Sequence, residues 1–458
     1  MRAAVFLLPV LCFAASNPSL DGLIDRAHGL PGEFAADALI RLASLKDVPA
    51  PRRIQLLQDA FHRAGEAQEP LKRRAGVARL AGAAAYMNRA YAQDLDGMSL
   101  RMRAIEAVMP LEPAKARALF QDVPPLHVPA VPCTEFLTYD VSRYYAVLGR
   151  LGAREPLKMV EPRIQEITSP VQVEPAARMI LALHTGNEDF RALVAALGGV
   201  VRRISGDDRS FAPTVVATGP AILDLVEESR ARGIPADTLT QAYRMYLVAN
   251  YAGPRCADTS LPDTPLQFFN EHLAADPVQP IGDSEAASTK KDAAADGLRT
   301  CQEADCRNLT DQMRGLMMNA GNRAYSDAEK ASPEWQEKLR QYLAAVENWK
   351  GDSTTGAQVY REKSGLYSDL LAITPPSRMQ ETVVQATLDF VRAGEYQARN
   401  RMEWFLPANV LIGRMELEPL GLGKLAPRVR TANDPVVSFY LDLESIAPRG
   451  PQPVMALL

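Results

Sequence analysis

The chain has 458 residues, of which 47% are hydrophobic and 23% charged, and its formal net charge is −4. This composition is typical of a globular protein and excludes a fibrous or wholly disordered chain. The mild acidic excess argues against nucleic-acid binding, which relies on clustered Lys and Arg. It also leaves no polybasic patch for an anionic membrane surface. The length predicts two or three domains, or one long helical array.

Residues 1–16 have the pattern of a secretory signal peptide. Arg2 supplies the positive charge, residues 3–13 form a short apolar run, and residues 14–16 are small, as cleavage requires. An apolar run of this length does not cross a bilayer, which takes roughly 20 residues. We therefore expect an exported protein, periplasmic or extracellular, with no membrane span in the mature chain. A lipid anchor at Cys12 is disfavoured because the residue before it is not small.

Four cysteines remain in the mature chain, namely Cys133, Cys256, Cys301 and Cys306. An even number in an oxidising compartment predicts two disulfides, and four cysteines allow three pairings. Cys133 and Cys256 both lie at proline-containing loops, which favours a long-range bridge between them and a local bridge between the other two. Free, buried thiols are the alternative. A zinc site is disfavoured, because no histidine lies beside the one close cysteine pair.

Apolar side chains at a spacing of three and four residues predict amphipathic helices along most of the chain. In chain order, the clearest stripes span residues 51–64, 190–204, 235–250 and 332–351. The last begins with a Ser–Pro pair suited to a helix N-terminus and ends at a glycine. Strand patterns do not recur. Only residues 436–443 fit a strand, and they fit a short helix equally well.

Proline and glycine interrupt the helical pattern at short intervals, for example at Pro156, at Pro170 and at Gly219–Pro220. Helices joined by short connections pack side by side as antiparallel hairpins. We therefore predict an all-α fold, an irregular α-α hairpin array that is either solenoid-like or a curved helical bundle. No fixed repeat pattern of the tetratricopeptide or ankyrin type is present.

A polar stretch rich in small residues, 276–300, predicts a linker or mobile loop, with an exposed Ala-rich helix as the alternative. It separates a predicted N-terminal helical domain, 17–275, from a smaller C-terminal helical domain, 301–420. The remaining residues, 421–458, are rich in Pro and Gly. We expect this C-terminal extension to wrap the body or to be partly disordered.

Two groups of tyrosines flank the first two cysteines: Tyr139, Tyr144 and Tyr145 follow one, and Tyr243 and Tyr246 precede the other. A bridge between the cysteines would make these groups neighbours. Tyrosines that line a groove stack on sugars or grip peptides, so these five are candidate binding residues. The alternative is a tyrosine-rich helix interface, which the helical spacing favours.

Asp207, Asp208 and Arg209 form a second candidate, an exposed turn able to bind a cation or a polar ligand. The simpler interpretation, which we favour, is that an aspartate caps or pairs locally at a helix end. Residues 94–97 resemble the start of a calcium loop but lack further oxygen ligands in register, so a turn between helices is preferred. The five histidines lack ligand spacing, and nucleophile elbows and phosphate-binding loops are absent. No metal or cofactor is predicted.

These features suggest an exported, non-catalytic binding or scaffolding protein of the cell envelope, whose partner is an envelope protein, a peptide or a glycan. Curved helical arrays present extended surfaces for such partners. The alternative is a carbohydrate-active hydrolase or lyase built on an α-α toroid, which needs acidic residues that converge in a deep pocket. A purely structural envelope component is a third possibility.

Overall fold

The computed structural model describes residues 20–75, 94–131, 137–204, 208–252, 261, 263–286, 304–351, 356–375, 378–394, 439 and 443. Within these ranges the protein is built almost entirely of packed helix pairs, which confirms the predicted all-α fold. No helix among the described residues is both long and apolar enough to cross a membrane.

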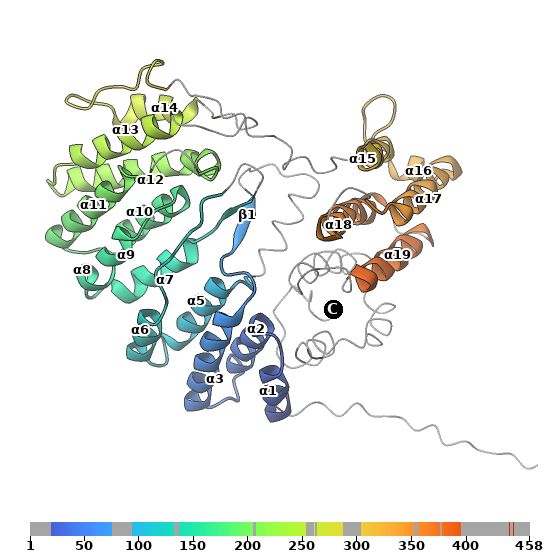
Figure 1. The fold of residues 1–458 in the computed structure, drawn as a ribbon, viewed down its shortest axis with the longest axis horizontal. Coiled ribbons are helices and arrows are strands. Elements are labelled where there is room, and N and C mark those ends of the chain that lie inside the picture. Colours follow the sequence, from blue (N-terminus) through green and yellow to red (C-terminus); the bar gives the residue numbers. More distant parts are fainter. Residues whose placement is uncertain are drawn as a thin grey trace, which may run out of the picture.

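Figure 1 shows the helices up to α14 stacked in chain order as a curved row. They are α1 (Leu20–His28), α2 (Gly32–Ala43), α3 (Ala50–Arg63), α5 (Gly97–Val108), α6 (Pro113–Gln121), α7 (Ser142–Gly152), α8 (Pro156–Met159), α9 (Glu161–Gln165), α10 (Val173–Ala182), α11 (Asn187–Val201), α12 (Phe211–Ala231), α13 (Asp237–Ala252) and α14 (Thr264–Phe268). Short 3-10 turns at Ala64–Glu66 and Pro170–Gln172 precede α5 and α10, and a π-helical turn, Phe269–Leu273, extends α14.

The middle of the row consists of helix pairs arranged in two layers. Helices α5, α7, α10 and α12 are the first members of the pairs, and each packs against the next. In the second layer, α9 packs on α11 and α11 packs on α13, whereas α6 makes no comparably close contact with α8 or α9. The first helices begin at residues 97, 142, 173 and 211. This uneven spacing explains why no sequence repeat marks the array.

The helical stripes predicted from the sequence form helices whose apolar faces are buried. The stripe at 190–204 corresponds to α11, which buries Phe190, Leu193 and Leu197. The stripe at 332–351 corresponds to α17 (Pro333–Asn348), where the Ser332 hydroxyl accepts a hydrogen bond from the Trp335 backbone N–H at 3.3 Å. This contact satisfies one of the N–H groups left unpaired at a helix start.

Gly219–Pro220 does not interrupt a helix, contrary to the sequence prediction. Helix α12 runs through both residues from Phe211 to Ala231. A proline inside a helix removes one backbone hydrogen bond, here the bond that the Val216 carbonyl would accept. Val216 is 53% exposed, so water can reach this turn of the helix. Burial of Ile222 and its neighbours on the opposite side offsets the lost bond.

The described strands are two short ones, β1 (Arg73–Ala75) and β2 (Leu137–Tyr139), paired antiparallel with Arg73 opposite Tyr139. The guanidinium of Arg73 lies over the Tyr139 ring, 5.8 Å from the ring centre. This separation is within the roughly 6 Å at which a cation–π contact forms. This two-stranded β-sheet joins the segment before α5 to the segment before α7. It therefore holds two neighbouring helix pairs together.

The later helices pack against one another. They are α15 (Ala304–Met317), α16 (Asp327–Lys330), α17, α18 (Gly356–Ile373) and α19 (Arg378–Gly394). The indole N–H of Trp335 donates to the Leu316 carbonyl at 3.1 Å and ties α17 to α15. Rings stack between α18 and α19, where Phe390 lies 4.9 Å from Tyr360 and 4.8 Å from Tyr367.

Two residues of the segment predicted as a strand or a short helix, Phe439 and Leu443, are described, and both are helical and buried. The Arg26 guanidinium on α1 lies 5.5 Å from the centre of the Phe439 ring. This contact brings one point of the predicted C-terminal extension against the first helix. The rest of that extension lies outside the described residues.

The first part of the predicted linker, residues 276–286, is fastened to the helical row. Arg244 on α13 donates to the Gln279 carbonyl at 2.7 Å and contacts both carboxylate oxygens of Glu285 at 2.8 Å. The Asn270 amide pairs with the backbone of Ile281 in both directions. A polar composition does not imply a mobile chain where charged side chains fix it in this way. Residues 287–300 lie outside the described residues, and the domain boundary stays a prediction.

Candidate functional site

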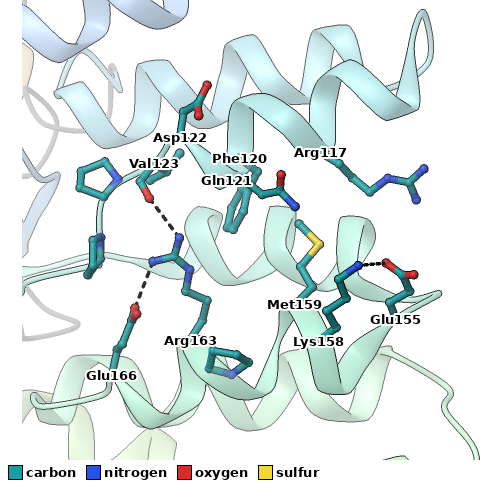
Figure 2. A pocket seen from close by; sticks show the side chains of 13 residues that line it. Arg117, Phe120, Gln121, Asp122, Val123, Glu155, Lys158, Met159, Arg163 and Glu166 are labelled. Carbon is teal, nitrogen blue, oxygen red and sulfur yellow. Dashed lines mark hydrogen bonds and ion pairs between the residues drawn. The ribbon is translucent and has the colours of Figure 1, made fainter.

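A groove of about 510 Å³ lies between α6 and the α8–α9 segment (Figure 2). The groove lies where α6 makes no close contact with α8 or α9, the next helices of its layer. Helices α8 and α9 are two short pieces separated near Pro162, which has no N–H to bond the carbonyl one turn earlier. After α6 the chain leaves through Pro124–Pro125, where a helix cannot continue. Prolines thus shape both walls.

The floor of the groove is apolar. The Phe120 side chain is 1% exposed, and its ring lies 5.4 Å from that of Tyr144, which supports it from the core. Met159 forms the opposite side, and its side chain is unbranched and flexible. The exposed Gln121 amide is directed toward the α8–α9 side in Figure 2, where it can both donate and accept hydrogen bonds.

Ion pairs occupy most of the charged groups along the rim. Arg163 contacts Glu166 at 3.2 Å and also donates to the Val123 carbonyl at 3.1 Å, which fixes the loop after α6 onto α9. Lys158 lies 3.8 Å from Glu155. In Figure 2 these two pairs lie toward opposite ends of the groove.

Arg117 differs from the other rim cations. It lies one helical turn before Gln121 on the same face of α6, because residues four apart are neighbours on a helix. Within the described part of the chain its guanidinium makes no hydrogen bond or ion pair. Asp122, at the end of α6, points away from α9 in Figure 2. The lining groups that no described residue engages are therefore the Arg117 guanidinium, the Gln121 amide and the exposed Asp122 carboxylate. A guanidinium and an amide form hydrogen bonds but do not transfer protons at neutral pH.

A second groove, of about 480 Å³, lies between α11, α13 and the loop at Val278. Gly199 forms part of its floor, and a Cβ added there would meet no described atom within 4 Å. Met245, 43% exposed, flanks it. Arg202 and Asp237 lie on its rim.

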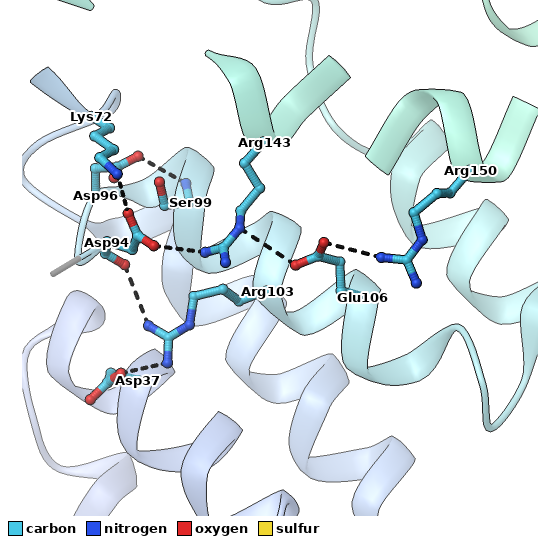
Figure 3. A network of polar contacts seen from close by, with 9 residues as sticks. All are labelled: Asp37, Lys72, Asp94, Asp96, Ser99, Arg103, Glu106, Arg143 and Arg150. Carbon is cyan, nitrogen blue, oxygen red and sulfur yellow. Dashed lines mark hydrogen bonds and ion pairs between the residues drawn. The ribbon is translucent and has the colours of Figure 1, made fainter. Parts of the chain in front are cut away.

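An ion-pair network joins α2, α5 and α7 (Figure 3). Asp94 accepts from Lys72 at 2.8 Å and from Arg143 at 2.9 Å. Glu106 on α5 continues the chain of contacts, at 3.5 Å from Arg143 and 3.2 Å from Arg150.

A further pair of the network reaches α2, where the fully buried Asp37 accepts from Arg103 at 2.7 Å. Because a buried carboxylate without its cation is strongly destabilising, this pair links the packing of α2 to that of α5. The network connects successive helices, so its arrangement is that of ion pairs that stabilise helix packing.

Asp96 is the N-cap residue of α5, and its side chain is buried, at 4% exposure. One carboxylate oxygen accepts from the Ser99 N–H at 2.8 Å, whereas the other is buried without a partner among the described residues. Burial raises the pKa of this carboxyl to about 6. Residues 94–97 thus form a capped turn before a helix, the preferred sequence interpretation. No cluster of three or more potential metal ligands occurs in the described part of the chain.

Four of the five predicted binding tyrosines are core residues. Tyr144 and Tyr145 contact each other edge to face on α7, and Tyr243 stacks on Tyr246 on α13. All four are almost fully buried, and burial raises the pKa of each phenol. They leave a ligand no surface to contact, so the structure gives the groove interpretation no support at these positions. Their arrangement is that of a tyrosine-rich helix interface. Tyr139 is half-buried on β2.

Asp208 connects three segments. Its carboxylate accepts from the Val131 N–H at 3.1 Å, from the Ser169 hydroxyl at 2.8 Å and from the Ser210 N–H at 2.9 Å. The Arg209 N–H donates back to the Val131 carbonyl at 3.1 Å. Its carboxylate oxygens are thus engaged by the protein itself, which matches the favoured interpretation of local pairing and extends it to distant segments.

Several predicted residues lie where the structure describes no side chain. Asp207, Cys133, Cys256 and Cys301 lie outside the described residues, and the side chain of Cys306 on α15 is likewise not described. The two disulfides therefore stay predictions.

Comparison with known proteins identifies no family. No protein-family model matches the chain, and no curated protein matches it. Among solved structures, the chain aligns with the NOT1 superfamily homology domain from Chaetomium thermophilum at 11% identity, covering 96% of this chain and 100% of that chain. The TM-score of this alignment is 0.16, so the likeness carries no argument about fold or function.

The sequence did not single out Arg117, Gln121 or Met159. Their one local signal is the set of prolines at 124, 125 and 162, which interrupts the helices on both sides. That signal predicts loops but not that two loops face each other across a groove.

Proposed function

We propose that this chain is an exported, non-catalytic binding protein of the cell envelope that holds a polypeptide segment of a partner in the groove between α6 and α9. The observation that carries the proposal is the groove itself, with an apolar floor and two recognition groups, Arg117 and Gln121, on one face of α6. Its volume falls within the roughly 300–1,000 Å³ of ligand pockets.

A polypeptide suits these groups better than other ligands do. An extended peptide presents backbone N–H and C=O groups, and the Gln121 amide can pair with both. Its side chains supply apolar surface for Met159 and Pro162, which are accessible in the groove. The alternative, a carbohydrate-active enzyme, requires a pair of available carboxylates. In this groove Glu166 is held in an ion pair with Arg163 at 3.2 Å, and the weakly paired Glu155 lies on a different wall from Asp122. The available carboxylates of the described lining therefore do not converge, which favours binding over hydrolysis.

Selection from a random-peptide library on the immobilised full-length mature chain tests the proposal. We expect enriched peptides whose binding is lost when Gln121→Trp places an indole across the groove. Gln121 is exposed, so this change leaves the core intact. The matched control is Gly199→Trp in the second groove, where the added side chain has open space. Thermal unfolding of both variants checks that they fold.

Failure to enrich any peptide would overturn the proposal. Loss of binding in Gly199→Trp, with binding intact in Gln121→Trp, would move the site to the second groove. Export is tested separately by cell fractionation and by sequencing the mature N-terminus, since residues 1–16 are predicted to be removed.

A further inference from the structure

Resting on the proposed function, we infer that the groove selects an acidic segment: Arg117 pairs with a carboxylate of the partner while an adjacent apolar side chain packs on the accessible lining residues Met159 and Pro162. The three cations on the rim of the groove are engaged unequally by the protein. Arg163 is fixed by two contacts and is 16% exposed, so it serves the wall of the groove. Arg117 has no such contact within the described residues.

Positive charge exceeds negative charge at the end of the groove where Arg117 lies. In Figure 2 Arg117 lies toward the end that carries Lys158 and Glu155. There, two cations face one carboxylate. The Lys158–Glu155 pair is long, at 3.8 Å, and highly exposed, at 77% and 61%, so it is weak and its ammonium can turn toward a ligand. An anionic group is the ligand chemistry that this end lacks.

The shape of the Arg117 guanidinium and its surroundings suit a carboxylate ligand. A guanidinium bonds a carboxylate through two parallel N–H donors, which a lysine cannot do. Arg117 is half-buried beside an apolar floor, where water screens such a pair less than at an open surface. The neighbouring Met159 and Pro162 favour an acidic peptide over an acidic glycan, which offers them little apolar surface.

The library selection with the full chain distinguishes this inference from the proposed function. We expect Asp and Glu to be enriched beside an apolar residue in the selected peptides. For one selected peptide, Arg117→Gln should weaken binding roughly tenfold in Kd, as expected for loss of one charge-assisted pair. Arg117→Lys should restore only part of it. The control is Arg154→Gln, which removes the same charge from an exposed position outside the groove.

Enrichment without acidic residues, or an acidic preference that persists in Arg117→Gln, overturns the inference and leaves the proposed function standing. Absence of any enriched peptide removes both. If a polyuronate oligosaccharide binds through Arg117 and acidic peptides do not compete with it, the carboxylate belongs to a glycan and the inference is wrong. An equal loss in Arg154→Gln also overturns it, because long-range charge would then explain the effect.

Discussion

The substitution Asp96→Asn should stabilise the protein at neutral pH and lose this gain in acid. Asp96 caps α5 with one carboxylate oxygen and buries the other without a described partner. Asparagine caps a helix as well as aspartate does, so the contact to the Ser99 N–H survives the change. The substitution removes the buried negative charge and leaves the shape of the side chain almost unchanged.

The magnitude follows from the pKa of Asp96, which burial raises from 3.8 to about 6. That difference corresponds to about 3 kcal/mol between the two protonation states. Below pH 3.8 the carboxyl is neutral in both the folded and the unfolded chain, so it does not lower the free energy of unfolding. As the pH rises from 3.8 through 6 the unfolded chain loses its proton first, so stability falls, and above 6 it is level. The new amide has an unpaired N–H group, which reduces the expected gain to about 1–3 kcal/mol.

Urea unfolding of the wild type and of Asp96→Asn, at about pH 7.5 and at about pH 4, measures both quantities. The gain in unfolding free energy should be present at the higher pH and largely absent at the lower one. Asp94→Asn is the matched control with the opposite sign, because it breaks contacts to Lys72 and Arg143. A destabilised Asp96→Asn at neutral pH, or an equal effect at both pH values, would refute the reasoning.

Three further predictions concern the loops. Non-reducing peptide mapping by mass spectrometry should find a Cys133–Cys256 disulfide. Reduction of this disulfide should lower the Tm, because closing a long loop stabilises the folded chain by about 4–5 kcal/mol. Free thiols at these two positions would contradict the prediction. Asp208→Ala should lower the unfolding free energy by about 2–4 kcal/mol in urea titrations, since three buried or half-buried donors lose their acceptor. Arg244→Met should speed proteolytic cleavage within 276–286, because this guanidinium holds two carbonyls and a carboxylate there.

Controls for the last two exist in the chain. Asp122→Ala removes an exposed carboxylate at the end of α6 and should change stability by less than about 0.5 kcal/mol. An effect as large as that of Asp208→Ala would show that the three contacts of Asp208 are not the cause. Unchanged cleavage in Arg244→Met would show that other contacts hold this segment.

For the clearest apolar stripes, the sequence by itself determined that the segment is helical and which of its faces is buried. The stripes at 190–204 and 332–351 became α11 and α17 because an amphipathic helix carries its period locally, and Ser332 caps α17 through a contact three residues away. The same periodicity explains why the tyrosines are core residues. An apolar stripe on a helix predicts that this face is buried, and the four buried tyrosines lie on such faces.

Only the tertiary structure decided what lies between the helices. Nothing near Arg117 in the sequence indicates that α9 faces it across a groove, or that the neighbouring cation Arg163 is already engaged. Likewise, the continuation of α12 through Pro220 and the attachment of residues 276–286 depend on partners far along the chain. Local periodicity fixes a helix within a few turns, whereas grooves, ion pairs and buried charges depend on distances between segments that the sequence places far apart.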